Sequence, residues 1–107
     1  MSEEYEQQKN NIGGRLKNIR KEMGLRKKDI ANFLGVSPGI VAFYEDGRRL
    51  LSLAGLLQFG KVNPELMLYI IGYRDFPYKL IEEMKKDRDR IIKIDKVNSI
   101  YILCDKM

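Results

Sequence analysis

The sequence predicts a mainly α-helical domain followed by a short C-terminal extension. Apolar residues recur at spacings of three and four over much of residues 12–72, which is the periodicity of one face of a helix. Glycine and proline separate these segments at short intervals, at positions where helices commonly end and begin. A chain of 107 residues fits one such domain.

The first helix is expected at about 11–23 and is preceded by a polar, acidic N-terminal arm at 1–11. The composition of that arm is not that of a signal peptide. Gly24 follows the helix at the position where a left-handed residue is common. The inward face of the helix is predicted to hold four apolar residues, Ile12, Leu16, Ile19 and Met23.

Two short helices follow. The start of the second, at about 26–34, is poorly capped because Arg26 stands where Ser or Thr would serve better. The third, at about 38–45, begins with the cap Ser37 and with Pro38 at the first helical position. Because the turn between them is short and contains glycine, the pair is predicted to form a helix-turn-helix.

The next two helices complete a compact five-helix unit. Ser52 is expected to cap the fourth helix. The fifth helix, at about 64–71, is so uniformly apolar that we expect it to be buried. The inward face of the fourth helix is predicted to hold Leu53, Leu56, Leu57 and Gly60.

Residues 74–107 are predicted to form a C-terminal extension. A sixth helix begins near Pro77, and residues 99–104 are expected to form a short β-strand, alone or in a hairpin with 91–94. A strand with unpaired backbone groups is prone to aggregation. We therefore expect it to pair with either the preceding segment or the same strand of a second subunit. The extension is therefore a candidate dimerisation element; the alternative is an appendage that only covers the fifth helix.

The amino-acid composition limits the classes of function that the chain can have. The chain has no histidine and no Gly-rich phosphate loop, and its single cysteine, Cys104, has no neighbouring His or Cys. We therefore expect no enzyme activity, no cofactor and no metal site. One cysteine and the absence of a long apolar run favour a cytoplasmic protein without a membrane partner.

The positive charge is concentrated in the predicted helical domain. Residues 12–73 hold ten Lys or Arg against five Asp or Glu, within a net charge of +5 for the whole chain. A polyanion such as DNA is one natural partner for this segment. The same charge would also serve solubility alone, so charge by itself does not select DNA.

Three stretches, IGGRLKNIRKEMGL, KKDIANFLGVS and EDGRR, followed by a leucine-rich segment, form a specific pattern. Through them, residues 12–72 resemble the lambda-repressor-like (Cro/repressor, Xre-type) helix-turn-helix family. The resemblance implies a five-helix domain that binds double-stranded DNA as a homodimer, with its third helix in the major groove. It also implies a partly buried ion pair between Arg20 and Glu45 that orients this helix.

In this interpretation the DNA contacts fall into two sets. The phosphate contacts would come from Arg26, Lys27, Lys28, Ser37, Arg48 and Arg49. The positions that face the groove would be Pro38, Gly39, Ala42 and Phe43. These four side chains carry no hydrogen-bond donor or acceptor, although base edges are read largely by hydrogen bonds. We therefore expect apolar contacts with thymine methyl groups, a contribution from DNA shape, and a steep salt dependence.

Two alternatives remain open for the third helix. Pro38, Ile40 and Phe43 would form an exposed apolar patch beside cations, and such patches often mark protein-binding surfaces. The chain would then act as an antagonist or adaptor of another regulator. In the second alternative, the apolar face packs under the C-terminal segment and the domain is inert.

Overall fold

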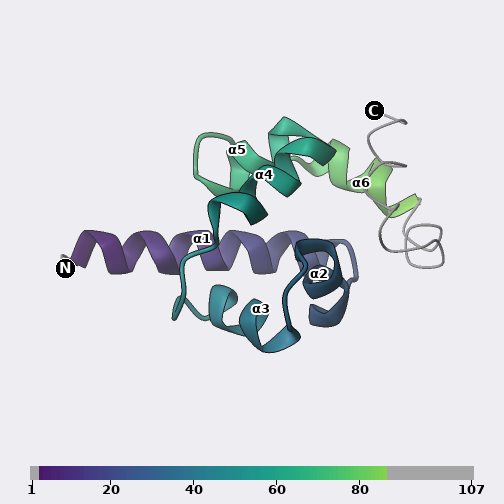
Figure 1. Cartoon of the computed structure of the whole chain (residues 1–107). Coiled ribbons are helices and arrows are strands. Elements are labelled where there is room, and N and C mark those ends of the chain that lie inside the picture. The colour runs from purple at the N-terminus through teal and green to yellow at the C-terminus, as the bar shows by residue number, and fades with distance from the viewer. Residues whose placement is uncertain (1–2, 87–107) are drawn as a thin grey trace.

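The computed structural model describes residues 3–86, and these residues form six α-helices (Figure 1). The mainly helical fold is therefore confirmed. Residues 3–86 contain no β-strand; the strands expected at 91–94 and 99–104 lie outside the described residues. The helices are α1 (Glu3–Glu22), α2 (Lys27–Leu34), α3 (Pro38–Glu45), α4 (Leu53–Val62), α5 (Pro64–Ile70) and α6 (Tyr78–Lys86).

Helix α1 is the central element of the fold. Figure 1 shows α2 and α3 on one side of it, and α4, α5 and α6 on the other. Helix α1 packs against α3 and α5, and α2 bridges to α4, so the two sides share one core. The most deeply buried side chains come from four helices and are Leu16, Ile19, Val41, Leu66, Ile70 and Ile81.

Helix α1 begins at Glu3 rather than at about residue 11, so the expected N-terminal arm is largely the first part of this helix. The arm lacks apolar periodicity and therefore carried no helix signal. Acidic residues in its first turn interact favourably with the helix dipole, and Lys9 pairs with Glu6 at 3.2 Å. Extending a helix that already packs elsewhere is easier than starting a new one.

Helices α1 and α3 meet at backbone distance. A Cβ atom at Gly13 would collide with the carbonyl oxygen of Tyr44 and would lie 3.0 Å from that of Glu45. At Gly14, the next residue of the same helix, a Cβ atom would meet nothing within 4 Å. Gly13 therefore allows the close approach that sets the position of the C-terminal half of α3.

The predicted inward face of α4 is partly wrong. Leu53 and Leu57 are 71% and 49% exposed, whereas Gly55, Phe59 and Val62 are buried. The ring of Phe59 packs against Phe33 of α2 at 4.9 Å between centroids, which turns this side of α4 inward. The larger aromatic contact and the small Gly55 decide the rotation of the helix.

Helices α5 and α6 complete the fold on the side of α1 that lies opposite α2 and α3. As expected, α5 is largely buried, through Leu66, Tyr69 and Ile70. Two side chains of α1 hold it: Arg15 donates a hydrogen bond to the carbonyl of Ile70 at 3.2 Å, and Asn18 donates one to the hydroxyl of Tyr69 at 3.0 Å. None of the helices within residues 3–86 has both the length and the apolar character that a membrane span requires.

Candidate nucleic-acid interface

The start of α2 is stabilised by a residue that lies inside the helix. Arg26 is the N-cap residue and its own side chain does not cap the helix. Instead, the carboxylate of Asp29 accepts the backbone N–H of Arg26 at 2.8 Å, and its two oxygens accept Nε and Nη2 of Arg26 at 3.2 Å each. This reciprocal contact compensates for the poor cap predicted from the sequence.

The same contact sets the protonation of Asp29. Partial burial raises the pKa of this carboxyl group, but the hydrogen bonds from Arg26 and the nearby charge of Lys28 outweigh burial. The net result is a pKa below the ordinary value of 3.8. Asp29 therefore neutralises part of the charge of Arg26 and leaves the exposed Lys27 and Lys28 as the cations of this end of α2.

A turn of three residues joins α2 to α3. Gly35 ends α2 with a φ of 72°, and the N–H of Val36 returns to the carbonyl of Ala31 at 2.9 Å. Ser37 then caps α3 as predicted, because its hydroxyl oxygen accepts the N–H of Ile40 at 3.4 Å. Pro38 occupies the first turn of the helix, and the expected bounds of α3 are confirmed.

Helix α3 has one exposed and one buried side. Val41, Tyr44 and Glu45 are buried against the rest of the domain. Of the four positions expected to face a groove, Pro38, Gly39 and Phe43 are exposed and Ala42 is half-buried. Ile40, expected in the apolar patch, is half-buried and packs against the core. The exposed surface of α3 is therefore small, uncharged and poor in hydrogen-bonding side chains.

The exit of α3 brings two of the predicted residues into direct contact. The N–H of Arg48 returns to the carbonyl of Phe43 at 2.9 Å, and the N–H of Gly47 returns to that of Tyr44 at 3.2 Å. With Gly47 at a φ of 76°, these bonds form a Schellman motif. The guanidinium of Arg48 lies over the ring of Phe43, 5.7 Å from its centroid. Both residues were predicted from the sequence to contact DNA, but their contact with each other was not. The only sequence signal for it is the spacing of the two residues around Gly47.

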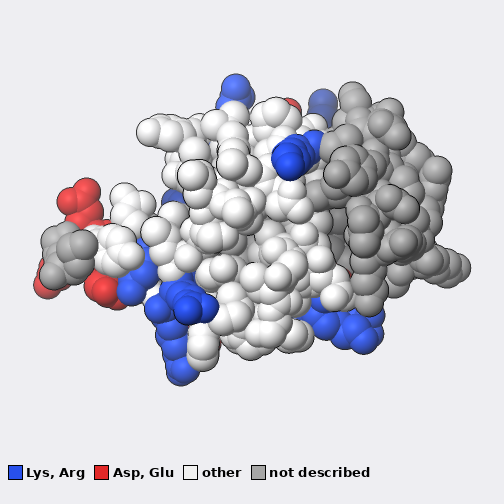
Figure 2. All heavy atoms as spheres, in the orientation of Figure 1, with Lys and Arg blue, Asp and Glu red and all other residues white. Residues whose placement is uncertain are grey.

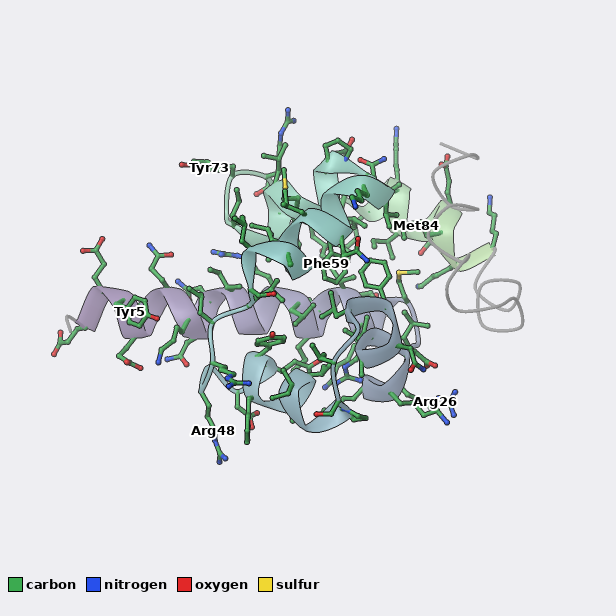
Figure 3. All side chains as sticks on the ribbon, viewed as in Figure 1. Tyr5, Arg26, Arg48, Phe59, Tyr73 and Met84 are labelled. Atoms are coloured by element: carbon green, nitrogen blue, oxygen red, sulfur yellow. The ribbon has the colours of Figure 1, made fainter. Side chains whose placement is uncertain are left out.

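Exposed cations lie on both sides of α3. Figure 3 places Arg26 and Arg48 on the same side of the molecule, at opposite ends of the part formed by α2 and α3. Figure 2 shows Lys and Arg side chains at both ends of this edge, with uncharged surface between them. Lys27, Lys28 and Arg49 are also exposed. We define the candidate surface as these two groups of cations together with the exposed side of α3 between them.

The predicted ion pair between Arg20 and Glu45 is confirmed. Nε and Nη2 of Arg20 donate to the two carboxylate oxygens of Glu45 at 2.7 and 3.0 Å, and Nη1 donates to the carbonyl of Leu25 at 3.2 Å. The side chains of Arg20 and Glu45 are 12% and 2% exposed. The hydrogen bond to Glu45 raises the pKa of Arg20 above its ordinary value, although partial burial lowers it. The negative charge of α3 is thus turned inward, away from the candidate surface.

Within residues 3–86, no cluster of His, Cys, Asp and Glu side chains is arranged to hold a metal ion. Comparisons of the chain with protein-family models, with curated proteins and with solved structures each found no match.

Proposed function

We propose that the chain is a sequence-dependent DNA-binding transcriptional regulator, whose α2, turn and α3 act as a lambda-repressor-like helix-turn-helix. One observation carries the proposal. The exposed, uncharged side of α3 lies between two groups of exposed cations, one at the start of α2 and one after α3. A helix flanked in this way matches a groove bordered by two phosphate backbones.

In the proposed complex, α3 lies in the major groove. Lys27 and Lys28 contact the phosphates of one strand, and Arg48 and Arg49 contact those of the other. Ser37 and the N–H of Gly39 at the start of α3 supply a further phosphate contact, since Pro38 has no N–H and the N–H of Ile40 already binds Ser37. Arg26 contributes less than its charge suggests, because Asp29 already accepts its hydrogen bonds.

The groove-facing residues give modest sequence preference. Gly39 has no side chain and the ring of Pro38 is compact, so the backbone of α3 can approach the base pairs closely. Ala42 and Phe43 contact thymine methyl groups, which are apolar features of the major groove. The remaining preference comes from DNA shape. Regulators of this kind bind paired half-sites as symmetric dimers, and we assign the dimer contact to residues 74–107.

A salt titration tests the proposal. Fluorescence anisotropy with random and genomic duplexes at several salt concentrations should give a log–log slope of several units. Arg48→Gln and Arg49→Gln should each lower that slope by about 0.9 for every duplex alike. Lys79→Gln is the matched control, because Lys79 is an exposed cation on α6 and lies outside the candidate surface.

Binding to no duplex, even at low salt, would overturn the proposal and favour the second candidate function. In that alternative the scaffold binds a protein through α3, as an antagonist or adaptor of another regulator. The observation that supports it is that Phe43 is 39% exposed. If α3 binds a protein in this way, the affinity of the chain for DNA should show no steep dependence on salt concentration.

A further inference from the structure

The end of α3 joins a groove-facing residue to a phosphate-binding one. In a Schellman motif, the residue after the left-handed glycine commonly makes an apolar contact with the residue five positions earlier. Here these two residues are Arg48 and Phe43, and the contact is a cation–π interaction at 5.7 Å. The backbone bonds that end the helix therefore also hold the guanidinium over the aromatic ring.

This contact restricts Arg48 before any ligand is bound. An exposed arginine side chain samples many rotamers, and it loses that freedom when it binds a phosphate. A guanidinium already held over a ring loses less, while its N–H groups, which lie in the guanidinium plane, can still donate from its edges. Arg49 is the natural comparison: its N–H also returns to the carbonyl of Phe43, at 3.2 Å. Within residues 3–86 the cation recorded over that ring is Arg48 alone.

We propose that Phe43 is a positioning residue for Arg48 and that the two side chains contact DNA as one unit. This inference depends on the proposed function. The C5-methyl group of thymine lies at the outer edge of the major groove, beside the backbone of its own strand. The ring of Phe43 contacts this methyl group while Arg48 binds the adjacent phosphate. The ligand of the unit is thus a pyrimidine with a C5-methyl group together with its phosphate.

A double-mutant cycle on the full chain tests the positioning role. Arg48→Gln should weaken DNA binding about threefold more in the wild-type background than in the Phe43→Leu background, because the leucine keeps apolar area but has no aromatic ring. Arg49→Gln is the matched control, and it should weaken DNA binding by the same factor in both backgrounds. Phe43→Tyr retains the ring and should restore the full effect of Arg48→Gln. Melting curves should show that all variants are folded, since the backbone bonds of the motif remain.

A change in the DNA tests the other half of the unit. Replacing thymidine by deoxyuridine removes the methyl group alone. Wild-type binding should weaken by a few-fold, whereas binding by the already weakened Phe43→Ala variant should weaken further by a smaller factor, because only the contact of Ala42 with a methyl group remains to be lost. Equal losses for the two proteins would overturn the methyl contact.

The measurements distinguish the loss of the positioning role from the absence of DNA binding. Suppose that the wild type binds DNA but Arg48→Gln weakens binding by the same factor in the wild-type and Phe43→Leu backgrounds. The positioning role is then overturned and the proposed function stands. If the wild type binds no duplex, both are overturned. In the free protein, NMR should show ring-current shifts of the Arg48 side-chain protons that vanish in Phe43→Leu. Unshifted protons in the wild type would contradict the contact without reference to DNA.

Discussion

The carboxylate of Glu45, at the last residue of α3, is held by both Nε and Nη2 of Arg20 on α1, at 2.7 and 3.0 Å. The pair crosses between the helix at the centre of the fold and the helix that presents the candidate surface. Next to it, Gly13 brings the backbone of α1 against the same end of α3. The orientation of α3 thus depends on one charged and one steric contact with α1.

Removing the negative charge of Glu45 should destabilise the fold. Glu45→Gln leaves the partly buried guanidinium of Arg20 without its counter-charge, and breaking a pair of this kind costs up to about 3–5 kcal/mol. Urea unfolding should therefore show a large fall in the free energy of unfolding. Glu82→Gln is the control, because the exposed pair with Lys85 at 3.5 Å contributes less than about 1 kcal/mol. An unchanged melting temperature in Glu45→Gln would rule out the orienting role.

The neighbouring glycines of α1 should respond to alanine in opposite ways. Gly13→Ala places a methyl group against backbone atoms of α3 and should lower the free energy of unfolding by about 1–3 kcal/mol. Gly14→Ala meets open space and should raise it by up to about 1 kcal/mol through helix propensity. Thermal unfolding of the two variants compares these effects directly. Similar shifts in both would contradict the close approach of α1 and α3.

The charge of Asp29 should make a pH-dependent contribution to stability. Because its folded-state pKa lies below the unfolded value near 3.8, the contribution is present above that value and is lost as the pH falls through the folded-state pKa. Asp29→Asn retains one acceptor oxygen for the N–H of Arg26 and removes the charge and the second acceptor oxygen. At pH 7 it should be less stable than the wild type by under about 1 kcal/mol. Chemical unfolding between pH 7 and pH 2 should show the gap closing below pH 4, and a constant gap would refute this account.

The proposed dimer contact can be tested by shortening the chain. Ile81 and Met84 of α6 are buried in the core, so a chain that ends at residue 73 would lose part of that core. A chain that ends at Lys86 keeps all six described helices. Light scattering should show a dimer for the full chain. A monomer for the shortened chain would assign the contact to residues 87–107, and a dimer would assign it to residues 74–86. If both have the same mass, the contact is not formed by residues 87–107.

Local signals in the sequence predicted most of the helix boundaries. Gly24, Gly35 and Gly47 have positive φ and end helices where expected, and Ser37 and Ser52 cap the helices that follow them. These effects act over one helical turn, so a single sequence is enough to locate them. The start of α1 was missed because residues 3–11 carry no apolar periodicity.

The sequence by itself determined the order of the helices, their capping residues, most of the core and the cations around α3. Only the tertiary structure decided which side of α4 is buried, how closely α1 approaches α3, and that Arg48 lies over Phe43. The physical reason is the range of the interactions. Caps and turns depend on adjacent residues, whereas burial and side-chain contacts depend on which helices meet and at what separation.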